Sequence, residues 1–166
     1  FIGFNKGFTN SSVTALALDT STMPRTIYAG TDTEAQGVLK STDGGTNWTL
    51  VNNGLTNLEI RSLAIHPTNP SIILAGTNGG IFRSTDGGNN WNSANSGLSN
   101  GETSAIYSLV FDTTTMYAGT NEGLFKSTDS GLTWNATSFS GGAESIVIDP
   151  QTTPHTLYVT TAGSFS

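Results

Sequence analysis

An eight-residue motif that returns at a fixed interval constrains the fold of this chain more than any other feature. The motif Ser-Thr-Asp-Gly-Gly-Thr-Asn-Trp occupies residues 41–48, and close variants of it occupy residues 84–91 and 127–134. Each copy begins 43 residues after the previous one. Intervals of about 40–50 residues are typical of the blades of β-propellers. The spacing therefore predicts a repeat architecture with one motif in each blade.

Short apolar segments recur around the motifs and predict four strands in each repeat. They alternate with Gly, Asn and Asp, and nothing in the chain has the period of a long amphipathic helix. The pattern predicts an all-β fold, a β-propeller of about four blades, each a four-stranded antiparallel sheet. The predicted strands are 13–18, 60–65, 106–111 and 143–148 for the first position, 26–30, 72–76, 115–119 and 156–160 for the second, and 37–40, 80–83 and 123–126 for the third, with each fourth strand starting at the motif Trp.

The repeat also predicts how the chain divides into blades. Residues 1–166 form a single propeller domain or a segment of one. Residues 1–10 align with the segment that begins at Trp48, which predicts the fourth strand of a composite or preceding blade. Two arrangements fit: closure of a four-bladed ring within the chain or between copies, or a segment of a larger ring of about six to eight blades. The expected blades are 13–57, 60–100, 106–140 and, with three strands only, 143–166.

The motif resembles the Asp box, also called the bacterial neuraminidase repeat. The resemblance extends to sialidases, sortilin-type receptors, xyloglucan-cleaving glycosidases and the photosystem II assembly-factor family. Residues 66–70, His-Pro-Thr-Asn-Pro, followed by Ala75-Gly76-Thr77 and a box, look like the widespread bacterial members. In these families the boxes lie at the periphery, away from the active centre.

We therefore expect the boxes to be structural. Their Asp side chains can accept hydrogen bonds from turn amides, their glycines can adopt unusual backbone angles, and their Trp rings can bury apolar area. One carboxylate in each box falls short of the six to eight oxygens that Ca²⁺ prefers, so we expect no metal and no cofactor. The residues expected to act structurally are Ser41, Asp43, Gly45, Trp48, Ser84, Asp86, Gly88, Trp91, Ser127, Asp129, Gly131 and Trp134.

Charge and composition exclude several partners. The formal net charge is −6, and the six Lys and Arg residues are scattered, so we expect no nucleic-acid partner. No apolar run approaches the roughly 20 residues needed to cross a bilayer, so no membrane insertion is expected. Few charges with much Thr, Ser and Asn resemble bacterial or archaeal surface and secreted proteins, whose signal segment would lie outside this sequence. Asn-x-Ser/Thr triplets, the acceptor pattern for glycosylation, occur at Asn10, Asn47 and Asn135, and such triplets are frequent by chance in a sequence rich in these residues.

A ligand site is expected on the rim that carries the fourth-to-first and second-to-third strand loops, because the repeat varies there. The second position of the first strands holds Thr14, Arg61, Tyr107 and Glu144, between neighbours that are apolar or small. Binding is expected to involve charged, amide and aromatic side chains of this rim. The candidate ligand-binding residues are Arg61, Tyr107, Glu144, Glu59, Asn78 and Asn121.

Catalysis has weaker support than binding. A sialidase gathers three arginines, and of the three in this chain only Arg61 is suitably placed, whereas Arg25 belongs to the opposite face and Arg83 adjoins a box. No carboxylate pair of the kind that glycosidases place about 5–10 Å apart can be identified. We expect a non-catalytic module that binds a glycan or a protein or acts as a scaffold, with self-association through open blade edges if the ring is not closed. The alternative is part of a glycoside hydrolase whose catalytic residues lie partly outside this chain.

Overall fold

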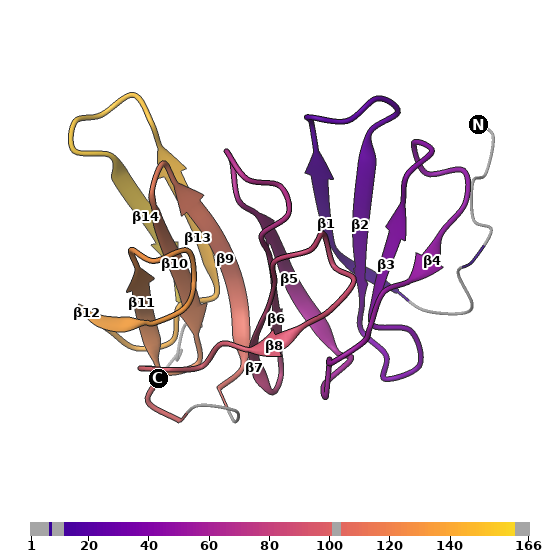
Figure 1. The fold of residues 1–166 in the computed structure, drawn as a ribbon. Coiled ribbons are helices and arrows are strands. Elements are labelled where there is room, and N and C mark those ends of the chain that lie inside the picture. Colours follow the sequence, from indigo (N-terminus) through magenta and orange to yellow (C-terminus); the bar gives the residue numbers. More distant parts are fainter. Residues whose placement is uncertain (1–6, 8–11, 101–103, 162–166) are drawn as a thin grey trace.

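The protein is a row of antiparallel β-sheets (Figure 1). The computed structural model describes residues 7, 12–100 and 104–161, and within these residues every regular element is a strand. The strands are β1 (Val13–Asp19), β2 (Thr26–Thr31), β3 (Val38–Ser41), β4 (Thr49–Leu50), β5 (Ile60–Ile65), β6 (Ile73–Thr77), β7 (Gly80–Ser84), β8 (Asn92–Ser93), β9 (Ile106–Asp112), β10 (Thr115–Thr120), β11 (Gly123–Ser127), β12 (Asn135–Ser140), β13 (Ser145–Asp149) and β14 (Thr156–Thr160).

Sequential strands pair in antiparallel fashion to make each sheet. Three sheets have four strands, in the orders β1-β2-β3-β4, β5-β6-β7-β8 and β9-β10-β11-β12, and β13 pairs with β14 in a fourth. Every neighbouring pair follows the chain order, so each sheet is a meander. This arrangement confirms the predicted all-β fold of four-stranded antiparallel blades.

The sheets pack face to face because their strands carry apolar side chains on both faces. In β5, Leu63 belongs to the cluster shared with the sheet β1–β4, whereas Ala64 belongs to the cluster shared with β9–β12. The third cluster joins β9–β12 to β13–β14 around Leu124 and Ile146. Full burial of one such Leu or Ile side chain contributes about 1.5–3 kcal/mol. The core is therefore divided into three interfaces between successive sheets.

The structure corrects two details of the predicted strands. Each fourth strand begins one residue after the motif Trp, and β4 and β8 are only two residues long. The first strand of the last sheet begins at Ser145 rather than at 143, because the amide of Ala143 donates to the carbonyl of Thr120 in the neighbouring sheet (2.8 Å). The predicted strands at 1–10 and 163–166 lie outside the described residues, apart from Gly7.

The described sheets form an open arc rather than a closed ring. In Figure 1 the sheet β1–β4 lies at one side of the row, the sheet β5–β8 stands in the middle, and the sheets β9–β12 and β13–β14 lie together at the other side. Leu16 on the first sheet and Tyr158 on the last are 68% and 60% exposed. Within the described residues, no helix is long and apolar enough to span a membrane.

Candidate functional site

The residues predicted at the second position of the four first strands meet at one place in the structure. Thr14, Arg61, Tyr107 and Glu144 together line a hollow of about 320 Å³. These residues come from β1, β5, β9 and the segment before β13, so each sheet contributes one side chain. Because the sheets fan around a common axis, the same repeat position converges there. The structure thus brings together the three variable residues Arg61, Tyr107 and Glu144 that the sequence analysis singled out.

Arg61 is the central side chain of this hollow. Its guanidinium carbon lies 5.4 Å from the centre of the Tyr107 ring, within the range of a cation–π contact. Arg61 and Glu144 are exposed, and Tyr107 is half-buried. Thr14 is held in place because its hydroxyl donates to the carbonyls of Gly30 (3.2 Å) and Ile60. The hollow therefore combines a cation, an aromatic ring and an exposed carboxylate.

A second, smaller hollow of about 120 Å³ adjoins the first and shares Thr14 and Arg61 with it. The amide of Asn78 joins two charged groups here, because its oxygen accepts from Nε of Arg61 and its nitrogen donates to the carboxylate of Glu59. The additional residues that line this hollow are Asp32, Glu59, Ile60 and Asn78.

Asn78 makes different contacts from the residues that hold its position in the neighbouring sheets. The carboxylate of Asp32 accepts from the amide of Ser12 (3.2 Å), and the side-chain oxygen of Asn121 accepts from the amide of Ala105 (3.2 Å). Both contacts fasten the residue that leads into a first strand. In the middle sheet the amide of Asn78 instead orients Arg61 and Glu59. The residue at this repeat position therefore bonds to the backbone in two sheets, and in the middle sheet it bonds to side chains that line the hollow.

The six predicted ligand residues thus fall into three groups. Arg61, Tyr107 and Glu144 share the larger hollow, and Glu59 and Asn78 lie in the smaller one. Asn121 lines neither of these hollows and contacts the backbone of its own sheet. Asp32 also lines the smaller hollow but is absent from the predicted set, and the repeat position that it shares with Asn78 could have indicated it.

The three Ser-Thr-Asp turns are held by their own side chains. In each turn the Ser hydroxyl donates to the Asp carboxylate, at 2.9 Å for Ser41 and Asp43, and the same carboxylate accepts backbone amides from the following residues. Gly45 has a φ of 94°, in the left-handed region that favours glycine. The other two turns repeat these contacts around Asp86 and Asp129.

These hydrogen bonds change the acidity of the carboxylates. Bonds from the Asn47 amide, the Asn47 side chain and Ser41 lower the pKa of Asp43 to about 2, and matching bonds from Asn90 and Ser84 do the same for Asp86. At Asp129, burial raises the pKa, but the bonds from Thr133, Ser127 and Leu132 outweigh it and lower the pKa to about 2. The carboxylates accept hydrogen bonds within their own turns, which fits a structural role. Among the described residues, no group of three or more His, Asp or Glu could hold a metal ion.

The cations before the first two turns, Lys40 and Arg83, each fasten one sheet to the next, a feature that the sequence analysis missed. Nζ of Lys40 donates to the carbonyl of Gly87 in the second turn (2.8 Å), and the Tyr28 hydroxyl donates to the same carbonyl (2.9 Å). Nε of Arg83 donates to the carbonyl of Ser130 in the third turn (2.8 Å). The presence of Lys or Arg before every motif, including Lys126, was the signal that could have found it.

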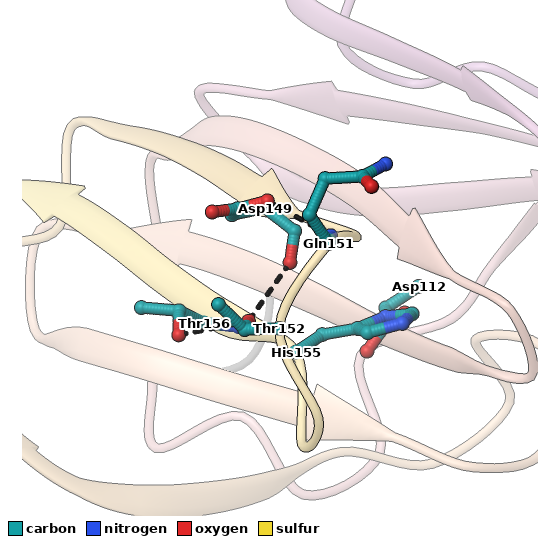
Figure 2. A network of polar contacts seen from close by, with 6 residues as sticks. All are labelled: Asp112, Asp149, Gln151, Thr152, His155 and Thr156. Carbon is teal, nitrogen blue, oxygen red and sulfur yellow. Dashed lines mark hydrogen bonds and ion pairs between the residues drawn. The ribbon is translucent and has the colours of Figure 1, made fainter.

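A separate polar network joins the last two sheets at the ends of their first strands (Figure 2). His155, in the loop before β14, contacts Asp112 at the end of β9. Beside it, the Thr152 hydroxyl lies 2.9 Å from that of Thr156 and accepts from the Thr156 amide (2.7 Å). Arg25, which belongs to the corresponding loop of the first sheet, donates to the carbonyl of Thr22 (3.4 Å). These loops are ordered by local contacts.

Fold and sheet order define this protein as a β-propeller protein of four-stranded antiparallel blades. Solved structures of this class are similar to it. An ancestral GH74 enzyme aligns with a TM-score of 0.74 and 22% identity over 95% of this chain and 22% of its own. The GH74 enzyme of Niastella koreensis aligns with a TM-score of 0.65 and 30% identity over 82% of this chain and 24% of its own.

A third similar structure is the extracellular domain of a putative hybrid two-component system from B. thetaiotaomicron. It aligns with a TM-score of 0.70 and 18% identity over 94% of this chain and 21% of its own. The chain thus spans between a fifth and a quarter of the length of these structures. No protein-family model matches the sequence, and a search of curated proteins finds no significant match.

Proposed function

We propose that this chain is a non-catalytic β-propeller module that binds a carbohydrate in the two adjoining hollows around Arg61. The observation that carries the proposal is the arrangement of Asn78, whose amide bridges Arg61 and Glu59 instead of fastening the backbone as Asp32 and Asn121 do. Asn78 orients two charged groups in a hollow and does not bond to the backbone as its counterparts do. We infer from this difference that the hollow is a binding surface.

The chemistry of the hollows suits a sugar. Sugar hydroxyls both donate and accept hydrogen bonds, and the hollows offer a guanidinium donor at Arg61 and carboxylate acceptors at Glu59 and Glu144. The aromatic ring of Tyr107 offers an apolar surface for the C–H face of a sugar ring. The larger hollow, at about 320 Å³, lies at the lower end of the size range of ligand pockets.

The three turns support membership of the Asp-box repeat proteins. Each turn has the same Ser-to-Asp hydrogen bond and the same bonds from backbone amides to the Asp carboxylate. Because these contacts occupy the carboxylates, we place the turns in the scaffold and the binding surface at the hollows. The likeness to a domain whose name describes it as extracellular supports a secreted or cell-surface location.

A second candidate is part of a glycoside hydrolase. It is favoured by the 30% identity with the GH74 enzyme of Niastella koreensis over 82% of this chain. Glu59 and Glu144 would then be the carboxylates to test, because they line the two adjoining hollows. The chain covers only 24% of that enzyme, so further residues would have to come from outside this sequence.

A glycan array followed by titration calorimetry tests the proposal. We expect the wild-type chain to bind at least one oligosaccharide, with xyloglucan oligosaccharides as the first probe. Arg61→Ala should weaken that binding at least about tenfold, which corresponds to about 1.4 kcal/mol. Arg25→Ala, which removes an arginine from the opposite face, is the matched control and should bind as the wild type does.

The same samples separate the two candidates. The binding module predicts that xyloglucan incubated with the chain releases no reducing sugar. Release that disappears in Glu59→Gln or Glu144→Gln would favour the hydrolase. Absence of binding to every glycan on the array, or binding that Arg61→Ala leaves unchanged, would overturn the proposed site.

A further inference from the structure

One carboxylate position of the repeat occurs at two interfaces between sheets and has an imidazole partner at only one of them. Asp19 ends β1 and Asp112 ends β9, and both are the seventh residue of their strand. His155 lies against Asp112, with 2.5 Å between Nδ1 and Oδ1 (Figure 2). In the second sheet His66 holds this position, and its ring packs against that of Phe111. Within the described residues, no imidazole reaches Asp19.

The residue that replaces His155 at the first interface is small. His155 follows Pro154 in the loop between the first two strands of the last sheet, and Ser71 follows Pro70 in the same loop of the second sheet. Asp19 and Ser71 line a hollow of about 300 Å³ on the rim opposite to Arg61. Because a serine side chain is much shorter than an imidazole, the hollow remains where the last interface has a ring.

A second hollow of about 170 Å³ adjoins the first, because Asp19, Ser21 and Pro70 line both. Leu18 and Ile65 give this second hollow apolar walls. We call the two hollows together the Asp19 groove. The groove combines apolar walls, against which a ring can pack, with a carboxylate that lines both of its parts.

The carboxylate of Asp19 is buried and accepts hydrogen bonds through one oxygen. The residue is only 9% exposed. Its Oδ1 accepts from the amide and the hydroxyl of Ser21 (2.8 and 2.6 Å). Among the described residues, no donor forms a hydrogen bond to Oδ2. Because a buried carboxylate oxygen without a donor is costly, a donor supplied by a ligand would be favourable there.

The charges that line the groove favour a cation. The carboxylates of Asp19 and Asp86 outnumber the one ammonium, that of Lys40. Nζ of Lys40 donates to a carbonyl of the second turn (2.8 Å), and no ion pair joins it to Asp19 in the described part of the chain. Nδ1 of His66 accepts from the amide of Thr68 (3.3 Å), which fits a neutral ring. The groove therefore has an excess of negative charge.

We propose that the Asp19 groove binds an organic cation that carries an N–H donor, a protonated imidazole or amine, with the donor on Oδ2 of Asp19. The contact between His155 and Asp112 is an example of this chemistry within the chain. The carbon atoms of the ligand pack against Leu18 and Ile65. The cation is either a free molecule or a side chain of another protein. This inference does not depend on what the hollows around Arg61 bind.

A titration with imidazole at about pH 6, where most of the imidazole is protonated, tests the proposal. We expect the backbone amide signal of Ser21 in nuclear magnetic resonance spectra to shift and to reach saturation. Asp19→Asn keeps an oxygen for the Ser21 amide but removes the charge, so binding should weaken at least about tenfold. Asp149→Asn is the matched control, because Asp149 holds the same repeat position and accepts from the Gln151 amide (2.9 Å). It should bind as the wild type does.

A second variant keeps the test decisive if Asp19→Asn does not fold. Ser71 is exposed, so Ser71→Lys should leave the fold intact while it places a competing ammonium in the groove. Imidazole binding should again weaken at least about tenfold. A peptide that repeats residues 153–156, Thr-Pro-His-Thr, separates the two sources of the cation. Tighter binding of the peptide than of imidazole indicates a protein side chain, and weaker binding indicates a free molecule.

A third variant checks the comparison between the two interfaces. His155→Ala removes the imidazole from Asp112 and should create a second imidazole site there. Binding at Asp112 in this variant without any shift at Ser21 would overturn the proposal, because it would locate the chemistry outside the groove. Absence of a saturable shift at Ser21 in the wild type, or equal affinity in Asp19→Asn and the wild type, would overturn it as well.

Discussion

Nδ1 of His155 lies 2.5 Å from Oδ1 of Asp112, and this contact links the last sheet to the one before it. Asp112 ends β9, and His155 precedes β14, so two loops of different sheets meet (Figure 2). Both side chains are mostly buried, with 16% and 28% of their surfaces exposed. The two-stranded sheet β13–β14 is also held by the small cluster around Ile146 and by the bonds from the amides of Ala143 and Ile146 to the sheet β9–β12. The polar pair therefore helps to attach the two-stranded sheet to its neighbour.

We expect the pair to stabilise the fold by about 1 kcal/mol, the usual value for a partly buried hydrogen-bonded pair. Asp112→Ala and His155→Ala should each lower the free energy of unfolding, and the double variant should lose less than the sum of the two. Urea denaturation of all four proteins gives the coupling energy. Fully additive losses would show that the two side chains act independently.

The turn carboxylates predict a loss of stability in acid. The pKa values of Asp43, Asp86 and Asp129 are about 2 in the folded protein, below the ordinary value of 3.8. Because the folded pKa is lowered, the unfolded chain binds these protons first, so stability is complete above about pH 4 and falls as the pH drops towards 2. The thermal midpoint measured between pH 5 and pH 2 should decline over this window.

Replacing the carboxylates checks the cause of that decline. The triple variant Asp43→Asn, Asp86→Asn and Asp129→Asn cannot titrate at the turns, so its thermal midpoint should change less between about pH 4 and pH 2 than that of the wild type. Glu34→Gln removes an exposed carboxylate from a loop outside the turns and should leave the wild-type slope in place. An unchanged slope in the triple variant would assign the acid sensitivity to other groups.

Tyr28 predicts a loss of stability in base. Burial and, to a smaller extent, the charge of Asp19 raise the pKa of Tyr28 from 10.0 to about 12. Since the folded pKa is raised, the stabilising effect is complete below about pH 10 and disappears as the pH rises through 12. An absorbance titration of tyrosinate should show one late transition near pH 12, and that transition should be missing in Tyr28→Phe.

The hydroxyl of Tyr28 also tests the contact between the first two sheets. Tyr28→Phe removes the hydrogen bond to the carbonyl of Gly87 and should lower the free energy of unfolding by about 1 kcal/mol. Tyr117→Phe is the matched control, because Tyr117 holds the same repeat position without such a bond among the described residues. Equal losses in the two variants would mean that the bond contributes nothing measurable.

The sequence predicted most of the fold because the motif spacing sets the register of every strand. It also predicted that Arg61, Tyr107 and Glu144 occupy equivalent positions, and convergence of the sheets brings them into one hollow. The role of Asn78 was not predictable, because Asn121 at the same repeat position bonds to the backbone instead. A choice between two partners within reach depends on side-chain geometry, which a repeat pattern does not encode.

The length of the fourth strands shows a second limit. Asn52 and Asn95 each accept a backbone amide of the third strand, from Val38 (2.8 Å) and Ile81 (2.7 Å). These side chains take the place of ladder bonds, so β4 and β8 end after two residues. Ser138 stands at this position in the next sheet, and β12 continues over six residues. The residue at this position therefore differs between the short and the long fourth strands, although the repeat predicts equal strands.

We expect the most severe loss of stability when the glycine that follows a short fourth strand is replaced. A Cβ atom at Gly97 would lie 1.9 Å from the carbonyl oxygen of Trp134, and the φ of Gly97 is 90°. Gly97→Ala therefore adds overpacking to the backbone strain and should cost about 3 kcal/mol or more. Gly44→Ala carries similar strain, with a φ of 72°, but would meet nothing within 4 Å, so it should cost about 1 kcal/mol. Urea denaturation of the two variants measures the difference, and equal costs would show that Trp134 can move aside.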